Sequence, residues 1–139
     1  MTEAQHQIAV IKWSEQPSIR KKWPCLKMLH HVANERYCTP AQGAKLKRMG
    51  VRRGVPDLDL PVPRGQYHGL FIEMKDETGR PSPDQDWWLG ELREQGYFTE
   101  CCHGSLPARE RGLKCVESVA CQDAIRVAPC AGAWIEIYS

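Results

Sequence analysis

The sequence predicts a single α/β domain in which a small mixed sheet is flanked by helices. A short apolar segment opens at Asp57, and a second one, residues 70–72, follows a turn at residues 64–66. Two such segments joined by a glycine-containing turn are typical of a β-hairpin. Helix-start signals at Thr2, Thr39 and Ser82 precede three helix-forming segments, which supplies the helices of the predicted fold.

The segments before the hairpin are expected to alternate between helix and strand. A first helix is expected over residues 2–13, a basic loop over residues 17–24 and a short strand over residues 26–32. Thr39 and Pro40 then provide a cap and a first helical residue for a helix that ends at Gly50.

The segments after the hairpin are expected to form one helix and one strand. Ser82 and Gln85 have the spacing of a capping box, with Pro83 at the first helical position. The helix should end at Gly96, and residues 97–102 should form the last strand.

Positive charge is concentrated in one part of the chain. The net charge is only +2, but between residues 20 and 55 there are ten Lys or Arg residues and one acidic residue. This block predicts a polyanionic partner. Five cations directly precede the hairpin and are candidate DNA-phosphate contacts: Lys45, Lys47, Arg48, Arg52 and Arg53. Complementing a helix C-terminus is an alternative explanation for Lys47 and Arg48.

Composition argues against several other classes of protein. There is no signal peptide and no apolar run long enough to span a bilayer, so a cytoplasmic protein is expected. Seven cysteines, an odd number without regular spacing, do not favour a disulfide framework. No CxxC pair is present, and Cys101, Cys102 and His103 are too closely spaced for a structural zinc site.

The hairpin carries the candidate chemistry. Glu73 and Lys75 should share one face of their strand, while Met74 points into the core. Pairing of the two strands would bring Asp57 close to Glu73. Two adjacent carboxylates repel unless a cation lies between them. Mg²⁺ meets this requirement, and a lysine beside it suits phosphodiester hydrolysis. A surface hairpin with ordinary salt bridges is the alternative interpretation.

Four spaced motifs of this sequence resemble a stand-alone virus-type replication-repair nuclease (VRR-NUC) domain of the PD-(D/E)xK nuclease superfamily. They are residues 47–57, residues 69–75, residues 82–85, and Leu92 with Gly96 and Tyr97. The resemblance covers about residues 2–104. It implies a PD-(D/E)xK nuclease-like fold and a Mg²⁺- or Mn²⁺-dependent endonuclease. It also implies branched DNA as the substrate, as for Holliday-junction resolvases in DNA repair, and a homodimer.

The resemblance also implies roles for individual residues. Asp57 and Glu73 would hold the metal together with the backbone carbonyl of Met74. Lys75 would position or activate the attacking water. Gln85 matches the glutamine of the helix that faces the site.

Three further residues match the family pattern less directly. Glu3 matches a first-helix glutamate that would be a third acid near the metal, although an acid in a first helical turn also complements the helix dipole. Glu35 is a weaker substitute for Glu3. Asn34 fits the pattern, and elementary chemistry gives no account of its role.

Residues 105–139 depart from the family pattern. The peptides of residues 105–115 and 127–137 share almost no identity, yet both back-translate to one nucleotide string when the frame is shifted by one nucleotide. That string contains an inverted repeat. We therefore expect this tail to be a translated CRISPR-like repeat, spacer and repeat rather than part of the nuclease.

Two functions from different classes follow from these patterns. The first is an active metal-dependent endonuclease specific for DNA structure. The second is a catalytically impaired DNA-binding remnant with a replaced C-terminus. A restriction-type enzyme is not favoured, because no additional segment is present to read bases.

Overall fold

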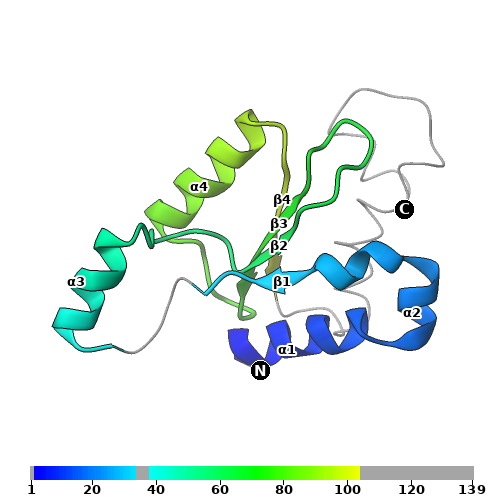
Figure 1. The fold of residues 1–139 in the computed structure, drawn as a ribbon, viewed down its shortest axis with the longest axis horizontal. Coiled ribbons are helices and arrows are strands. Elements are labelled where there is room, and N and C mark those ends of the chain that lie inside the picture. The colour runs from blue at the N-terminus through cyan, green and yellow to red at the C-terminus, as the bar shows by residue number, and fades with distance from the viewer. Residues whose placement is uncertain (1, 34–37, 104–139) are drawn as a thin grey trace.

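The computed structural model describes residues 2–33 and 38–103. Helices and strands alternate along the chain, and the predicted α/β fold class is confirmed (Figure 1). The elements are α1 (Glu3–Ser14), α2 (Pro17–Lys22), the 3-10 helix η1 (Pro24–Met28), β1 (His30–His31), α3 (Pro40–Arg48), β2 (Leu58–Leu60), β3 (Leu70–Lys75), α4 (Pro83–Glu94) and β4 (Phe98–His103).

The four strands form one mixed sheet in the order β1-β2-β3-β4. β2 and β3 pair antiparallel with Leu58 opposite Ile72, and a bridge between Arg64 and Tyr67 closes the connecting turn. β3 and β4 pair in parallel, because α4 carries the chain back to the end of the sheet at which β3 begins. The predicted hairpin is therefore the centre of the sheet rather than a surface feature.

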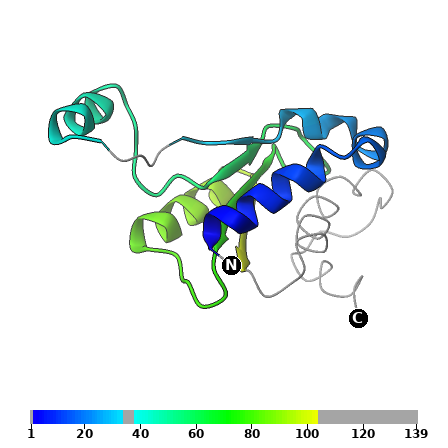
Figure 2. The same ribbon diagram turned by 90° about the horizontal axis from the view of Figure 1, so that it is seen from below.

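Helices cover both faces of this sheet. On one face, the alternate β3 residues Leu70, Ile72 and Met74 join the buried apolar cluster with residues of α1. The helix α4 lies against the other face (Figures 1 and 2). On the α4 side, the hydroxyl of Thr99 donates to the carbonyl of Leu89 at 3.5 Å. The core consists of Val10, Trp13, Trp23, Leu26, Leu29, Leu58, Leu60, Val62, Leu70, Ile72, Met74 and Cys102.

Two expectations for the N-terminal region are wrong. The basic segment expected to be a loop forms α2, because Pro17 occupies a first helical position and the Trp23 N–H donates to the Ile19 carbonyl at 2.8 Å. The strand expected over residues 26–32 is limited to His30–His31. Its apolar start lies in η1, where the 3-10 turn buries Leu26 completely, and a short apolar run does not distinguish these conformations.

α3 stands apart from the sandwich of sheet and helices (Figure 2). It begins at the predicted cap Thr39, which forms a capping box with Gln42, and none of its residues is buried. We use the term basic arm for α3 and the residues that follow it, 40–54. The structure does not describe Asn34, Glu35 or residues 105–139, so the predictions made for them are not tested. Among the described residues, no helix combines the length and apolar character needed to cross a bilayer.

Candidate active site

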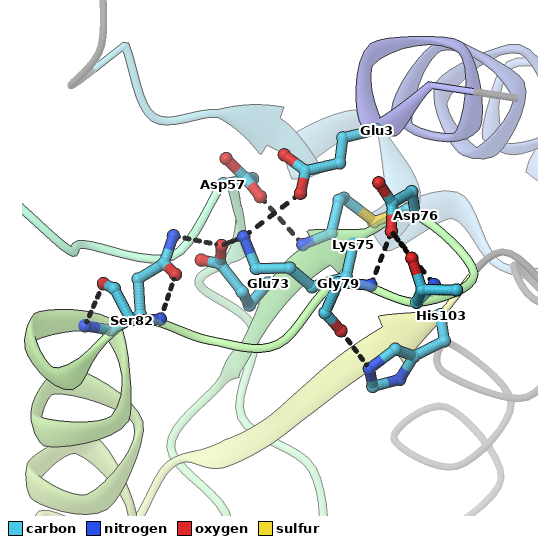
Figure 3. A network of polar contacts seen from close by, with 11 residues as sticks. Glu3, Asp57, Glu73, Lys75, Asp76, Gly79, Ser82 and His103 are labelled. Atoms are coloured by element: carbon cyan, nitrogen blue, oxygen red, sulfur yellow. Dashed lines mark hydrogen bonds and ion pairs between the residues drawn. The ribbon is translucent and has the colours of Figure 1, made fainter.

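Acidic side chains converge where β2 and β3 are joined to α1 (Figure 3). The Met74 backbone N–H donates to Oδ2 of Asp57 at 2.8 Å, which holds this carboxylate beside the strand that carries Glu73. The Asp57 carbonyl in turn accepts hydrogen bonds from Val32 N–H and from Nδ1 of His31. β1 therefore fixes the backbone of Asp57 from one side, and β3 fixes its side chain from the other.

Lys75 lies between two of the acids. Its Nζ is 3.0 Å from Oε1 of Glu73 and 3.3 Å from Oε1 of Glu3, a residue 72 positions earlier in the chain. Burial alone would lower the pKa of Lys75, but its hydrogen bond to Glu73 and the charges of Glu73 and Glu3 outweigh burial and raise this pKa. The two acids therefore favour the charged form of the Lys75 amine.

The side-chain amide of Gln85 makes two hydrogen bonds, one through its oxygen and one through its nitrogen. Its Oε1 accepts from the Ser82 N–H at 2.8 Å, which completes the capping box of α4. Its Nε2 donates to Oε1 of Glu73 at 2.5 Å. The start of α4 is thus tied directly to the central acid of the cluster, which places all five predicted residues from Glu3 to Gln85 in one network.

Glu73 retains one buried oxygen that is not satisfied. Its side chain is only 1% exposed, and Oε2 has no hydrogen-bond partner within the described part of the chain. Burial raises the pKa of Glu73 to about 7; the Lys75 hydrogen bond opposes this, while the charges of Asp57 and Glu3 reinforce it. A buried carboxylate oxygen without a donor costs free energy that a cation would recover.

These observations fit a hard divalent ion. No group of three or more His, Cys, Asp and Glu side chains that could hold a metal is present in residues 2–33 and 38–103. Mg²⁺ does not require one, since it uses one or two carboxylates and retains several waters. Asp57 and Glu73, whose Oε2 has no hydrogen-bond partner among the described residues, would supply such a pair, while Glu3 accepts from Lys75.

Two contacts that support the site were not predicted from the sequence. The loop after β3 is held by Asp76, whose Oδ1 accepts from the backbone N–H groups of Thr78 and Gly79. Those two backbone bonds lower the pKa of Asp76. Nε2 of His103 lies 3.0 Å from the Gly79 carbonyl, so β4 anchors the same loop (Figure 3). An Asp-x-Thr-Gly turn was the available signal in the sequence.

His6 is a further residue that the sequence did not single out. It is fully buried on α1, one turn after Glu3, and its Nε2 is 3.7 Å from Oε1 of Glu77. This pair joins α1 to the loop that follows Lys75. Its only sequence signal was a polar residue on the apolar side of a helix.

The predicted phosphate-binding cations are separate from the carboxylate cluster. Lys45, Lys47, Arg48, Arg52 and Arg53 are all exposed on the basic arm. The arm returns to the body at Arg53, whose carbonyl accepts from Nε1 of Trp88 at 2.9 Å. This bond places Arg53 beside α4, the helix that carries Gln85.

Comparison with known proteins gives one family. The model of the VRR-NUC domain family matches residues 1–106. A solved structure of a VRR_NUC domain protein is similar to this chain with a TM-score of 0.71 and 30% sequence identity, over 88% of this chain and 90% of the other. No curated protein matches the chain.

Proposed function

Because this chain belongs to the VRR-NUC domain family, a family of nucleases, we propose that it is a Mg²⁺- or Mn²⁺-dependent endonuclease that hydrolyses phosphodiester bonds in branched DNA. The observation that carries this proposal is the buried oxygen of Glu73 beside Asp57 and Lys75. Buried carboxylate oxygens in purely structural salt bridges are as a rule hydrogen-bonded, so this one requires an explanation.

The ion would be held by Asp57 and Glu73, with the Met74 carbonyl as a further ligand. When bound, it would supply Lewis-acid polarisation of a phosphate oxygen and a more acidic water. It would also satisfy the oxygen that burial leaves without a partner.

Lys75 would act as a protonated group. Because its neighbours raise its pKa, it is better suited to orienting the attacking water and offsetting charge on the phosphate than to accepting a proton. Glu3 would restrain the amine from the α1 side at 3.3 Å. Gln85 would keep Oε1 of Glu73 turned away from the ion, so that Oε2 remains available.

The basic arm would bind the DNA backbone. Contacts from exposed Lys and Arg side chains to phosphates do not depend on base sequence. Specificity would then come from the shape of the DNA, in keeping with a branched substrate. A four-way junction has two equivalent strands to cut, and two copies of this chain related by a two-fold axis would match that symmetry.

Cleavage of a labelled four-way junction tests this function. The parent protein should cut it with Mg²⁺ or Mn²⁺ and not with EDTA, and Glu73→Gln should reduce the rate by about a hundredfold or more. Glu94→Gln, which alters an exposed acid in the last turn of α4, is the matched control and should retain full activity.

Three other outcomes would count against the proposal. Cleavage that persists in EDTA would show that the reaction needs no metal ion. Equal activity of the Glu73→Gln and Glu94→Gln variants would show that the carboxylate cluster is not the catalytic site. Junction binding by the parent protein without any cleavage would support the DNA-binding remnant instead.

A further inference from the structure

Two adjacent tryptophans lie on α4 outside the apolar core. The rings of Trp87 and Trp88 meet edge to face with centroids 5.5 Å apart and planes at 83°. Trp87 is 59% exposed, whereas Trp13 and Trp23 in the core are 3% and 8% exposed. Leu89 supplies the buried contact of α4 with the sheet, so the fold does not require an indole at position 87.

The basic arm holds this aromatic pair in place. Nε1 of Trp88 donates to the Arg53 carbonyl at 2.9 Å. At Gly54 the arm comes so close to Asp84 that a Cβ would lie 2.6 Å from its backbone carbon. Figure 1 shows the segment between α3 and β2 passing the first turn of α4. Trp88 therefore connects the exposed indole of Trp87 to the backbone of the segment that carries Arg52 and Arg53.

The charges around Trp87 favour contact with a base of a DNA strand over contact with a phosphate. Asp86 precedes Trp87, and Glu91 lies one turn further along the helix; both are exposed acids that would repel phosphate. The arm cations attract phosphate from the adjacent side. A strand whose backbone follows the arm would thus present a base, rather than a phosphate, to the indole.

We propose that Trp87, supported by Trp88, is a stacking platform for an unpaired nucleobase of the DNA substrate. This inference rests on the nuclease function proposed above. Every base has a face that can stack on an indole, so such a contact is independent of sequence. Bases within an intact duplex are already stacked on one another. The platform therefore selects DNA with unpaired nucleotides, bound within one helical turn of Gln85.

Binding in EDTA separates this inference from catalysis. The parent chain and its variants are titrated with a splayed fork carrying single-stranded arms and with a blunt duplex of equal nucleotide number, at matched salt. Trp87→Ala should weaken fork binding by about 5- to 150-fold, the loss expected for one stacked base. Duplex binding should change by less than about twofold, because phosphate contacts are unaltered.

Three variants make the test specific. Trp87→Phe retains an aromatic face and should keep most of the fork preference. Trp87→Leu retains apolar area without a ring face and should behave like Trp87→Ala. Ile8→Ala removes an exposed apolar side chain, 53% exposed on α1, and should bind both DNAs like the parent chain.

Several results would overturn the platform. One is an equal loss of fork and duplex binding in Trp87→Ala. Another is parent-like fork binding by Trp87→Leu together with an altered oligomeric state of Trp87→Ala in sizing chromatography, which would assign the indole to a contact between copies. If fork preference follows Trp87 but the parent never cleaves DNA, the nuclease proposal fails and the platform stands.

Discussion

Replacing Gly54 with alanine should destabilise the fold more than any other glycine-to-alanine change in the basic arm. Gly54 has φ of 83°, which costs an L-residue about 1 kcal/mol. Its added Cβ would lie 2.6 Å from the backbone carbon and 2.8 Å from the carbonyl oxygen of Asp84. Moving that backbone costs about 2 kcal/mol, as for overpacking of a dense contact. The expected loss in unfolding free energy is therefore about 3 kcal/mol.

Two other glycines separate the cost of the backbone conformation from the cost of the steric clash. Gly50 has φ of 99° but no atom within 4 Å of an added Cβ, so Gly50→Ala should cost only about 1 kcal/mol. Gly90 lies inside α4 with open space around it, and Gly90→Ala should stabilise by about 0.5–1 kcal/mol through helix propensity. Urea unfolding followed by far-UV circular dichroism measures all three.

The clash should also affect the site. Asp84 directly precedes Gln85, which donates to Glu73, so displacement of the first turn of α4 should lower DNA cleavage even where Gly54→Ala is fully folded. An unfolding free energy for Gly54→Ala no lower than that for Gly50→Ala would refute the close approach of the basic arm to α4.

Four further results are expected. Gln85→Glu retains an acceptor for the Ser82 N–H but places a second carboxylate against Glu73, so cleavage should fall about tenfold or more with little change in melting temperature; unchanged cleavage would remove Gln85 from the site. Because burial raises the pKa of Glu73 from 4.5 to about 7, the metal-free folded state holds its proton more tightly than the unfolded chain does. Unfolding free energy should therefore fall as the pH rises across that interval. Mg²⁺ should raise the melting temperature more at about pH 8 than at about pH 5, and equal shifts would contradict this. The double change Arg52→Ala and Arg53→Ala should reduce the slope of log affinity for DNA against log salt by about 2, and a slope equal to the parent's would exclude phosphate contacts there. Sequencing of the gene should reveal two near-identical nucleotide copies encoding residues 105–115 and 127–137, and their absence would end the repeat hypothesis.

The parts of the fold that were predictable rest on strong local signals. Thr2, Thr39 and Ser82 each cap a helix as predicted, and all three form capping boxes, although the box was predicted only for Ser82. The hairpin followed from two apolar segments and a glycine turn, and strand alternation placed Glu73 and Lys75 together. These features depend on residues close in sequence, where the period of the pattern decides the outcome.

The parts that were not predictable depend on tertiary packing. Leu26 lies in a 3-10 turn because the core accepts its side chain there, and an isolated apolar run carries no sign of this. The contacts of His6 with Glu77 and of His103 with Gly79 join elements distant in sequence. The exposure of Trp87 was equally hidden, since two adjacent tryptophans in a helix carry no sign of which one lies outside the core.

The hydrogen bond between Lys75 and Glu3 has a consequence for the order in which the candidate active site forms. The lysine amine is held between a strand acid and an acid at the very start of the first helix. Transient detachment of that helix would leave Asp57 beside β3 while releasing one restraint on the amine. Amide hydrogen exchange of residues 3–14 should therefore report how often the Lys75 ammonium is released from Glu3, separately from global unfolding.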